Sequence, residues 1–372
     1  MGLMYIWQKP DWPHFSWKME ELIPVLGRAR QAQGRILVQA GLVGLEEHAE
    51  MIVEEAFSTA AIEGENIDRN LIRSSVAKRL GLPTAGLPPE GRHVDGLVEL
   101  LMDATQNHRE PLTTNRLHGW QAALFPTGFS GIQKIQVGRW RKGEDPMQVI
   151  SGPPGREKIH FLAPPSSQVP TEMKVFLRWW QHPPKNLDGL LRAGIAHFWF
   201  VTIHPYEDGN GRIARAITDM ALSQDEDSSR RLYSLSKQIV SERMEYYEVL
   251  EKSQKNECDI TKWLQWFLET YTKAIHASEQ TIKKATFIAK FWQHFSSHTL
   301  NGRQLKVVKK LLEAEPKGFE GGLTNKKYVS ITKVSRETAK RDLVDLENKG
   351  LLKRNPGKGR SISYSLRLDF DR

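Results

Sequence analysis

Residues 204–215 read His-Pro-Tyr-Glu-Asp-Gly-Asn-Gly-Arg-Ile-Ala-Arg, and this stretch decides the fold. The preceding run, residues 190–203, is apolar almost all round, which predicts a buried helix. After the stretch, apolar residues repeat at helical spacing from Ile213 to Ala221. This repeat predicts a second, amphipathic helix that begins near Gly211. The sequence therefore predicts two helices joined by a glycine-rich loop.

The loop has the composition of an anion site. Gly209 and Gly211 permit backbone geometries that are closed to other residues, and Asn210 tolerates the left-handed region. Several N–H groups can therefore turn toward one point, at the positive end of a helix dipole. Arg212 and Arg215 lie three residues apart in the first turn. Their guanidinium groups share a face and can clamp phosphate oxygens.

Two other residues of the stretch can supply chemistry. Asp208 is suited to hold a hard cation such as Mg²⁺, which takes one or two carboxylates together with phosphate. His204 can accept a proton near neutral pH. Taken singly, a histidine before a proline is usually a loop or core residue, and a Gly-Asn-Gly turn is only a turn. Their combination favours a site that holds a metal-bound polyphosphate and deprotonates the group that attacks it.

The stretch resembles the signature of the Fic family, His-x-Phe-x-(Asp/Glu)-Gly-Asn-Gly-Arg-x-x-Arg, at every specified position but Tyr206, where the family usually has Phe. Most Fic proteins transfer AMP from ATP to a hydroxyl side chain of a target protein. The resemblance implies that His204 is the general base and that Asp208 holds Mg²⁺ on the α- and β-phosphates. It implies that the anion hole and the arginines that steady the outer phosphates are Gly209, Asn210, Gly211, Arg212 and Arg215. The intact Gly-Asn-Gly segment favours adenylyl transfer over the kinase reaction of some relatives.

A second informative segment, residues 58–64, reads Ser-Thr-Ala-Ala-Ile-Glu-Gly and ends a helical pattern. It resembles the inhibitory motif of the Fic family, (Ser/Thr)-x-x-x-Glu-(Gly/Asn), with Thr59, Glu63 and Gly64 in register. The resemblance implies that the Glu63 carboxylate pairs with Arg215 and occupies the space of the γ-phosphate. Removing this carboxylate should then raise transferase activity. Relatives with this glutamate can also use it to align water and remove AMP, so the reverse reaction stays open.

A hairpin is predicted over residues 147–163, with strands at Gln148–Ser151 and Lys158–Leu162 around a Gly-Pro-Pro-Gly turn. An isolated hairpin is only marginally stable. In the Fic family a hairpin here, the flap, pairs with an extended segment of the target protein by β-augmentation. The resemblance implies that a target protein docks there; a packed surface hairpin is the alternative.

The basic character of the chain lies at its C-terminal end. Residues 301–372 hold 18 Lys and Arg against 9 Asp and Glu, a net charge of +9 that equals the formal net charge of all 372 residues. Helices are expected over 303–313, 324–329 and 336–349, followed by strands over 351–354 and 361–366. This order predicts a winged helix-turn-helix.

The helix from residue 336 is typical of recognition helices in bacterial regulators of this class. If residues 300–372 bind DNA, the side chains expected at the major groove are Ser335, Arg336, Thr338, Lys340 and Arg341. Lys358 and Arg360 are expected at the backbone or the minor groove. Recognition of a specific DNA site would need two copies, hence a homodimer. A protein-interaction module is the alternative.

Composition limits the remaining classes. The single Cys258 excludes an internal disulfide and indicates a reducing interior. No apolar run reaches membrane-spanning length, and residues 1–17 are aromatic and polar rather than a signal peptide. A cytoplasmic protein without a membrane partner is therefore expected.

These observations predict a mainly α protein in three segments. Residues 1–85 are a helical segment with the inhibitory motif, residues 86–290 a Fic helical core with a short β-hairpin flap, and residues 300–372 a winged-helix domain. The leading hypothesis is an autoinhibited protein adenylyltransferase that uses ATP and Mg²⁺. The competing class is a DNA-binding transcriptional regulator whose Fic core senses nucleotide.

Overall fold

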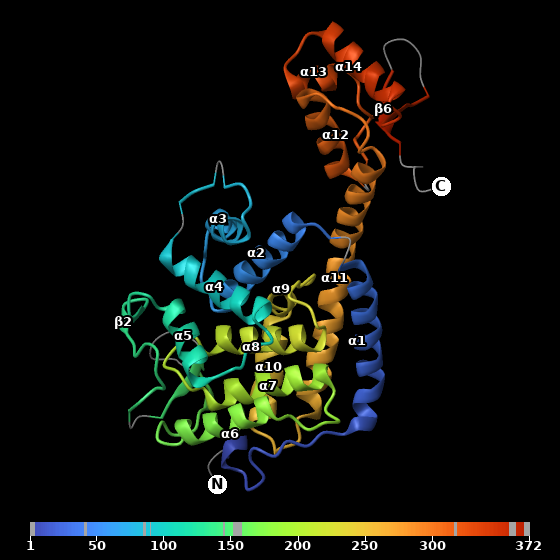
Figure 1. The fold of residues 1–372 in the computed structure, drawn as a ribbon. Coiled ribbons are helices and arrows are strands. Elements are labelled where there is room, and N and C mark those ends of the chain that lie inside the picture. Colours follow the sequence, from blue (N-terminus) through green and yellow to red (C-terminus); the bar gives the residue numbers. More distant parts are fainter. Residues whose placement is uncertain are drawn as a thin grey trace. The chain divides into compact units, whose positions relative to one another are not determined.

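The computed structural model describes residues 4–40, 43–84, 87–89, 91–143, 146–151, 158–315, 318–356 and 362–367. These residues are mostly helical, with a few short antiparallel strand pairs (Figure 1). The chain forms two compact units, one of residues 1–41 and 45–279 and one of residues 42–44 and 280–372. The three segments expected from the sequence stay a prediction.

The first unit contains a 3-10 turn, η1 (Ile6–Gln8), and a series of helices. In chain order these are α1 (Met19–Ala40), α2 (Leu45–Ile62), α3 (Arg69–Leu80), α4 (Arg92–Gln106), α5 (Thr114–Leu124), α6 (Val169–Gln181), α7 (Gly189–Ile203), α8 (Asn210–Asp225), α9 (Leu235–Ser241) and α10 (Arg243–Gln254). The long helix α11 (Thr261–His294) begins in this unit. Its strands are β1 (Phe129–Ser130), β2 (Gln133–Lys134), β3 (Gln148–Ser151) and β4 (Lys158–Leu162).

Helices α7 and α8 form the centre of this unit (Figure 1). Every residue of α7 from Leu190 to Ile203 except Arg192 is buried, as the apolar run predicts. Gly194 lets α11 approach, because a Cβ there would lie 2.9 Å from a ring carbon of Phe267. The indole of Trp263 donates to the Gly194 carbonyl oxygen at 2.8 Å.

The second helix of the signature begins where the sequence predicts, but it is not amphipathic. Nearly every residue of α8 from Asn210 to Ser223 is buried. The polar residues on it are buried because α2, α4 and α5 pack against α8 in addition to α7. Its two arginines therefore lie inside the protein and require partners of opposite charge.

The flap forms as predicted. Strands β3 and β4 pair antiparallel, with Gln148 opposite Leu162 and an irregularity at Val149 and Ile150. The predicted turn, residues 152–157, lies outside the described residues. At the base of the hairpin, Phe161 packs edge-on against Tyr5, with ring centroids 5.2 Å apart. The aromatic N-terminal residues thus pack on the flap as well as on the helical core.

The second unit has the predicted winged-helix order. It contains α12 (Gly302–Ala314), α13 (Asn325–Thr332), α14 (Arg336–Asn348), and the antiparallel strands β5 (Leu352–Arg354) and β6 (Tyr364–Leu366). Its helices are joined by the buried carboxylate of Asp342 on α14. This carboxylate accepts from Arg303 Nε at 2.9 Å and from the Tyr328 hydroxyl at 2.9 Å. Within the described part of the chain, no helix is long and apolar enough to cross a membrane.

Candidate active site

His204 lies at the end of α7 with its backbone in the left-handed region, at φ +52°. Its N–H donates to the Phe200 carbonyl oxygen at 3.0 Å, and its ring Nδ1 lies 3.2 Å from the Val201 carbonyl oxygen. Because a carbonyl oxygen only accepts, Nδ1 carries the proton and Nε2 keeps a lone pair. Burial lowers the pKa of the imidazole to about 4, so it is neutral at pH 7. His204 is thus held in the form that can accept a proton at Nε2.

Arg141 fixes the backbone that carries His204. It is 5% exposed, and its Nε donates to the His204 carbonyl oxygen at 2.7 Å. Its Nη2 donates to the Pro164 carbonyl oxygen at 2.5 Å, just after the flap. The backbone N–H of Arg141 donates to the Pro205 carbonyl oxygen at 2.9 Å. Burial lowers the pKa of the guanidinium to about 10, which still leaves it charged at pH 7. The sequence carries no signal for this role.

The Gly-Asn-Gly loop is closed by a reciprocal pair of hydrogen bonds. Asn210 Oδ1 accepts from the Tyr206 N–H at 2.9 Å, and Asn210 Nδ2 donates to the Tyr206 carbonyl oxygen at 2.8 Å. Gly209 has φ +88°, and a Cβ there would lie 3.0 Å from the ring of Phe125. Because the Asn210 side chain is used inside the loop, its predicted part in anion binding falls to its backbone N–H.

The N-terminus of α8 offers N–H donors to an anion. The first N–H groups of a helix have no partner within the helix, and the residue before α8 is a glycine without a side-chain cap. The side-chain Nε of Arg212 is buried and has no hydrogen-bond partner among the described residues. These donors fit a phosphate group.

Tyr206, the one departure from the Fic signature, is fully buried, and its hydroxyl has a partner. The hydroxyl oxygen lies 3.0 Å from His118 Nδ1 on α5. The ring packs against Trp140, with centroids 5.0 Å apart. Burial raises the pKa of the phenol well above its ordinary value, so the hydroxyl stays protonated. The tyrosine is therefore accommodated as a packing residue that makes one extra hydrogen bond.

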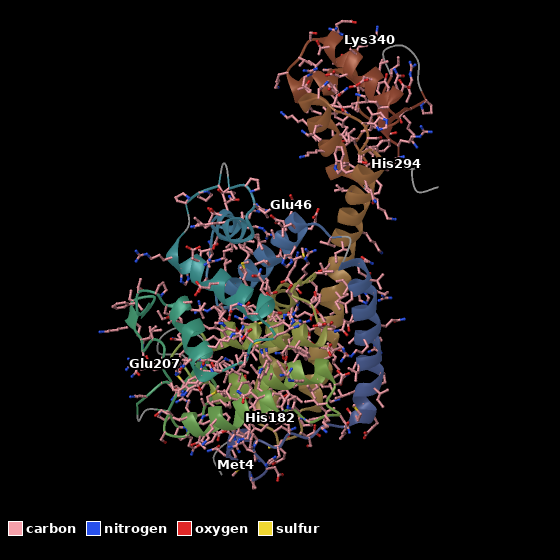
Figure 2. All side chains as sticks on the ribbon, in the orientation of Figure 1. Met4, Glu46, His182, Glu207, His294 and Lys340 are labelled. Atoms are coloured by element: carbon pink, nitrogen blue, oxygen red, sulfur yellow. The ribbon has the colours of Figure 1, made fainter. Side chains whose placement is uncertain are left out.

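Asp208 projects from the loop and is held from both sides. Its Oδ1 accepts from the Gly209 N–H at 2.6 Å, and its Oδ2 accepts a short hydrogen bond from the Ser130 hydroxyl on β1. The next acid along the chain, Glu207 (labelled in Figure 2), accepts from the Gln136 N–H at 3.0 Å and holds the loop. Among the described residues, no three His, Cys, Asp or Glu side chains gather to hold a metal ion. The single carboxylate of Asp208 fits Mg²⁺ that is held mainly through phosphates and water.

The end of α2 places Glu63 against Arg215. The helix closes with a Schellman pattern, in which the Glu65 N–H donates to the Ala60 carbonyl oxygen at 3.0 Å and Gly64 has φ +81°. Arg215 is 3% exposed and donates from Nη2 to Glu63 Oε1 at 2.6 Å. Its pKa is raised, because the Glu63 carboxylate outweighs the effect of burial.

Two further contacts define the position of this carboxylate. Arg215 Nε donates to Thr59 Oγ1 at 2.6 Å, so Thr59 and Glu63 of the predicted inhibitory motif bind the same guanidinium. A Cβ on Gly211 would lie 2.4 Å from Glu63 Oε1. The carboxylate therefore occupies the space over the anion loop.

Arg212 meets a second acid from the same segment, which the sequence does not predict. Its Nη1 donates to Glu65 Oε1 at 2.8 Å, and Glu65 Oε2 lies 3.2 Å from His93 Nε2 on α4. The guanidinium also lies 5.0 Å from the ring centroid of Phe125. The only sequence signal for this contact is that a glutamate directly follows the motif.

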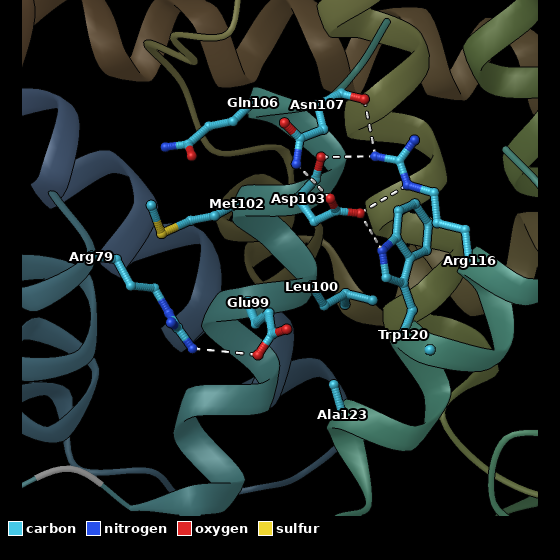
Figure 3. Close-up of a pocket in the computed structure, with 11 residues that line it drawn as sticks. Arg79, Glu99, Leu100, Met102, Asp103, Gln106, Asn107, Arg116, Trp120 and Ala123 are labelled. Atoms are coloured by element: carbon cyan, nitrogen blue, oxygen red, sulfur yellow. Dashed lines mark hydrogen bonds and ion pairs between the residues drawn. The ribbon is translucent and has the colours of Figure 1, made fainter. Parts of the chain in front are cut away.

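A separate hollow of about 520 Å³ lies between α4 and α5 (Figure 3). The charged side chains that line it are paired with one another. Asp103 accepts from Trp120 Nε1 at 2.7 Å and from Arg116 Nε at 2.8 Å. Its other oxygen accepts from Asn107 Nδ2 at 2.7 Å. With these groups paired to each other, the hollow is a feature of helix packing, and the chemistry gathers at the α7–α8 loop.

On α14, the predicted DNA contacts differ in exposure. Arg336, Lys340 (labelled in Figure 2) and Arg341 are exposed, and no ion pair is recorded for them in the described part of the chain. Thr338 is half-buried, and its N–H donates to the capping hydroxyl of Ser335 at 3.1 Å. The predicted contacts Lys358 and Arg360 lie outside the described residues.

Three stretches of the chain match known protein families. Residues 111–222 match the Fic/DOC family, and residues 320–364 match the DeoR-like helix-turn-helix domain. Residues 5–82 match a domain of unknown function, DUF4172, which spans the segment that carries Glu63.

Several solved structures are similar to this chain. A Fic family protein from Desulfovibrio desulfuricans G20 is 17% identical with a TM-score of 0.60, over 95% of this chain and 98% of that chain. A Fic domain containing signaling protein from Bacteroides thetaiotaomicron VPI-5482 is 15% identical with a TM-score of 0.48, over 73% of this chain and 97% of that chain. Residues 134–508 of Fic-1 from C. elegans are 20% identical with a TM-score of 0.48, over 73% of each chain. The chain therefore contains a Fic/DOC family domain, with a Fic-like helical core, and a DeoR-like helix-turn-helix domain at its C-terminal end.

Proposed function

We propose that this protein is an autoinhibited protein adenylyltransferase, which transfers AMP from ATP to a Ser, Thr or Tyr hydroxyl of a target protein or of itself. The observation that carries the proposal is the position of the Glu63 carboxylate. It lies over Gly211 and pairs with Arg215, both of which are on α8, directly after the loop that begins with His204 in its proton-accepting form. The base His204 and the anion site thus lie at the two ends of one short loop, and the Glu63 carboxylate occupies the anion site.

In the proposed reaction, His204 Nε2 takes the proton of the target hydroxyl. The hydroxyl oxygen attacks the α-phosphorus of ATP, and the bond from that phosphorus to the bridging oxygen of the β-phosphate breaks. Pyrophosphate leaves, and AMP stays on the target oxygen. The neutral imidazole at pH 7 suits this role, because only the unprotonated form can act as the base.

The phosphates would lie at the N-terminus of α8. The N–H groups of Asn210 and Gly211 and the unpaired Nε of Arg212 would bind their oxygens. Asp208 would hold Mg²⁺, which neutralises the charge that develops on the leaving pyrophosphate. Arg215 would bind the outer phosphate once Glu63 has withdrawn.

The target protein would dock on the flap, residues 147–163. Strands β3 and β4 form a sheet of two strands only, so each has an outer edge that no other described strand pairs with. An extended segment can add to such an edge through main-chain hydrogen bonds. This mode would bring its hydroxyl toward the loop, because Arg141 ties the end of the flap to the His204 backbone.

Label transfer from α-labelled ATP with Mg²⁺ tests the proposal. The native chain, Glu63→Gly and Glu63→Gly/His204→Ala would be compared, with label read on the chain itself and on lysate proteins. Strong labelling of Glu63→Gly alone is expected, since this protein lacks the carboxylate that pairs with Arg215 and keeps the base. Absence of label in all three proteins, with ATP still bound, would refute adenylyl transfer.

The same carboxylate could align water for the reverse reaction. If so, the native chain should release AMP from a target labelled by Glu63→Gly, and Glu63→Gly should not. Chromatography of the released nucleotide distinguishes AMP removal from simple decay.

A second function rests on the C-terminal domain. The exposed Arg336, Lys340 and Arg341 on α14 support DNA binding by residues 300–372, with a homodimer reading two half-sites. In that case the Fic core would sense nucleotide for a transcriptional regulator. DNA retention that weakens with salt and is lost on truncation after residue 300 would support this role. His204→Ala should leave such binding unchanged.

A further inference from the structure

The segment after α2 carries two acids, and each meets one arginine of the signature. Glu63 pairs with Arg215 at 2.6 Å, and Glu65 pairs with Arg212 at 2.8 Å. The left-handed Gly64 between them is fixed by the hydrogen bonds that close the helix. The two carboxylates are therefore parts of one rigid turn.

Glu65 lies outside the recognised motif, yet both oxygens of its carboxylate have partners. The Arg212 side chain is only 3% exposed and that of Glu65 28% exposed. The second oxygen of Glu65 is held by His93 on α4. The pKa of Glu65 is lowered, because hydrogen bonding to His93 and the charge of Arg212 outweigh burial. The carboxylate is therefore ionised and oriented toward the arginine at neutral pH.

Charge balance requires such partners when no nucleotide is bound. Arg212 and Arg215 lie next to each other on α8, and both are almost completely buried. Two buried guanidinium groups without anions would be strongly destabilising, so the two acids of the α2 end, together with Asp208 at 3.8 Å from Arg212, neutralise them. A nucleotide that brings its own phosphate charges makes the two acids of the α2 end redundant and repels them.

We propose that Glu65 is a second competing carboxylate, which must leave Arg212 before the nucleotide phosphates can use it, as Glu63 must leave Arg215. The inference rests on the proposed function and deepens its regulation. The α2 end then closes the site at two points, and loss of Glu63 alone releases only one of the two arginines. Because Gly64 joins the two acids in one closed turn, the withdrawal of one carries the other with it.

The test is calorimetric titration of the full chain with a non-hydrolysable ATP analogue and Mg²⁺. The proteins are Glu63→Gly, Glu63→Gly/Glu65→Gln and, as the matched control, Glu63→Gly/Glu50→Gln. Glu50 lies on α2, before this segment, and pairs with Arg73 of α3 at 2.8 Å. We expect Glu65→Gln to tighten binding about tenfold over Glu63→Gly, as for one hydrogen-bonded ion pair that no longer has to be broken. The Glu50 control should bind like Glu63→Gly.

Unchanged or weaker binding after Glu65→Gln would overturn the proposal, because a residue that positions Arg212 for phosphate would lose affinity when removed. His93→Ala in the Glu63→Gly background is the second variant, and it decides the matter if Glu65→Gln does not fold. It frees one oxygen of Glu65 and should tighten binding by a smaller factor, and weaker binding would count against the proposal.

Label transfer by the same proteins separates the two proposals. If Glu63→Gly transfers label but Glu65→Gln does not tighten binding of the analogue, only the proposed role of Glu65 is refuted, and the proposed reaction stands. Tighter binding without transfer by any variant refutes the proposed reaction and supports the competition. Failure of every variant to bind the analogue overturns both.

Discussion

Replacement of Arg141 by Met should damage both stability and catalysis while leaving nucleotide affinity unchanged. The guanidinium makes two strong hydrogen bonds, to the carbonyl oxygens of His204 at 2.7 Å and of Pro164 at 2.5 Å. Methionine is of similar length but donates to neither, so two buried carbonyl oxygens would lose their partners.

The size of the effect follows from these contacts. A hydrogen bond that involves a charged group contributes about 1.5–3 kcal/mol, so two contribute about 3–6 kcal/mol. Methionine avoids the cost of burying a charge, which offsets part of this loss. We expect a net loss of about 2–4 kcal/mol, and a fall in Tm of about 5–10 °C for a unit of this size. Because His204 depends on Arg141 for its backbone position, label transfer should fall about 100-fold.

The measurements are scanning calorimetry of the full chain and label transfer in the Glu63→Gly background. Arg139→Met is the matched control, since Arg139 lies two residues away and is exposed. Titration with the ATP analogue should give the same Kd for both proteins, because none of the hydrogen bonds described for Arg141 involves Gly209, Asn210 or Gly211. If Arg141→Met is as stable and as active as Arg139→Met, the assignment of Arg141 as the residue that positions His204 is wrong.

Three further outcomes are expected. Tyr206→Phe, which removes the hydroxyl bonded to His118 but keeps the ring, should cost about 1 kcal/mol in calorimetry and leave label transfer unchanged; a several-fold change in transfer would give the hydroxyl a role in the reaction. In the nucleotide-free protein, the His204 ring should titrate by NMR near pH 4, since burial lowers its pKa to about 4. Because that pKa is below the value in the unfolded chain, this group should cost stability as pH falls below about 6.5 and have no effect above it, and titration near pH 6.5 would contradict the described burial. Lys340→Glu/Arg341→Glu should weaken retention on DNA strongly and reduce its salt dependence, with label transfer unaffected; unaltered retention would show that α14 does not contact DNA through these residues.

The local sequence pattern is enough to predict much of the fold and the loop of residues 204–209. The flap strands have the predicted bounds, and α7 and α8 begin and end within a few residues of expectation, because spacing and glycine positions act over short distances. The contact between Glu63 and Arg215 spans 152 residues and was expected only through resemblance to a known motif.

Other residues of the site could not be predicted from the sequence, and the reason is the same for each of them. Arg141, Ser130 and Glu65 each act through contacts with residues that are far away in the sequence, and none of them lies in a periodic pattern or a recognised motif. The burial of the polar side chains of α8 could not be predicted from the sequence for the same reason. Amphipathic spacing describes one apolar face, whereas four helices that pack on α8 also cover its polar side chains, and this depends on tertiary structure.

The loop of residues 204–209 connects two helix ends of opposite sign. His204 directly follows the last residue of α7, where the carbonyl groups leave a partial negative charge, and the anion site is the first turn of α8, where the N–H groups leave a partial positive charge. In the proposed reaction the proton moves toward the first end and negative charge accumulates at the second. The backbone of one short connection thus sets up an electric field along the direction in which charge separates, and that field stays in place whichever hydroxyl is brought to the site.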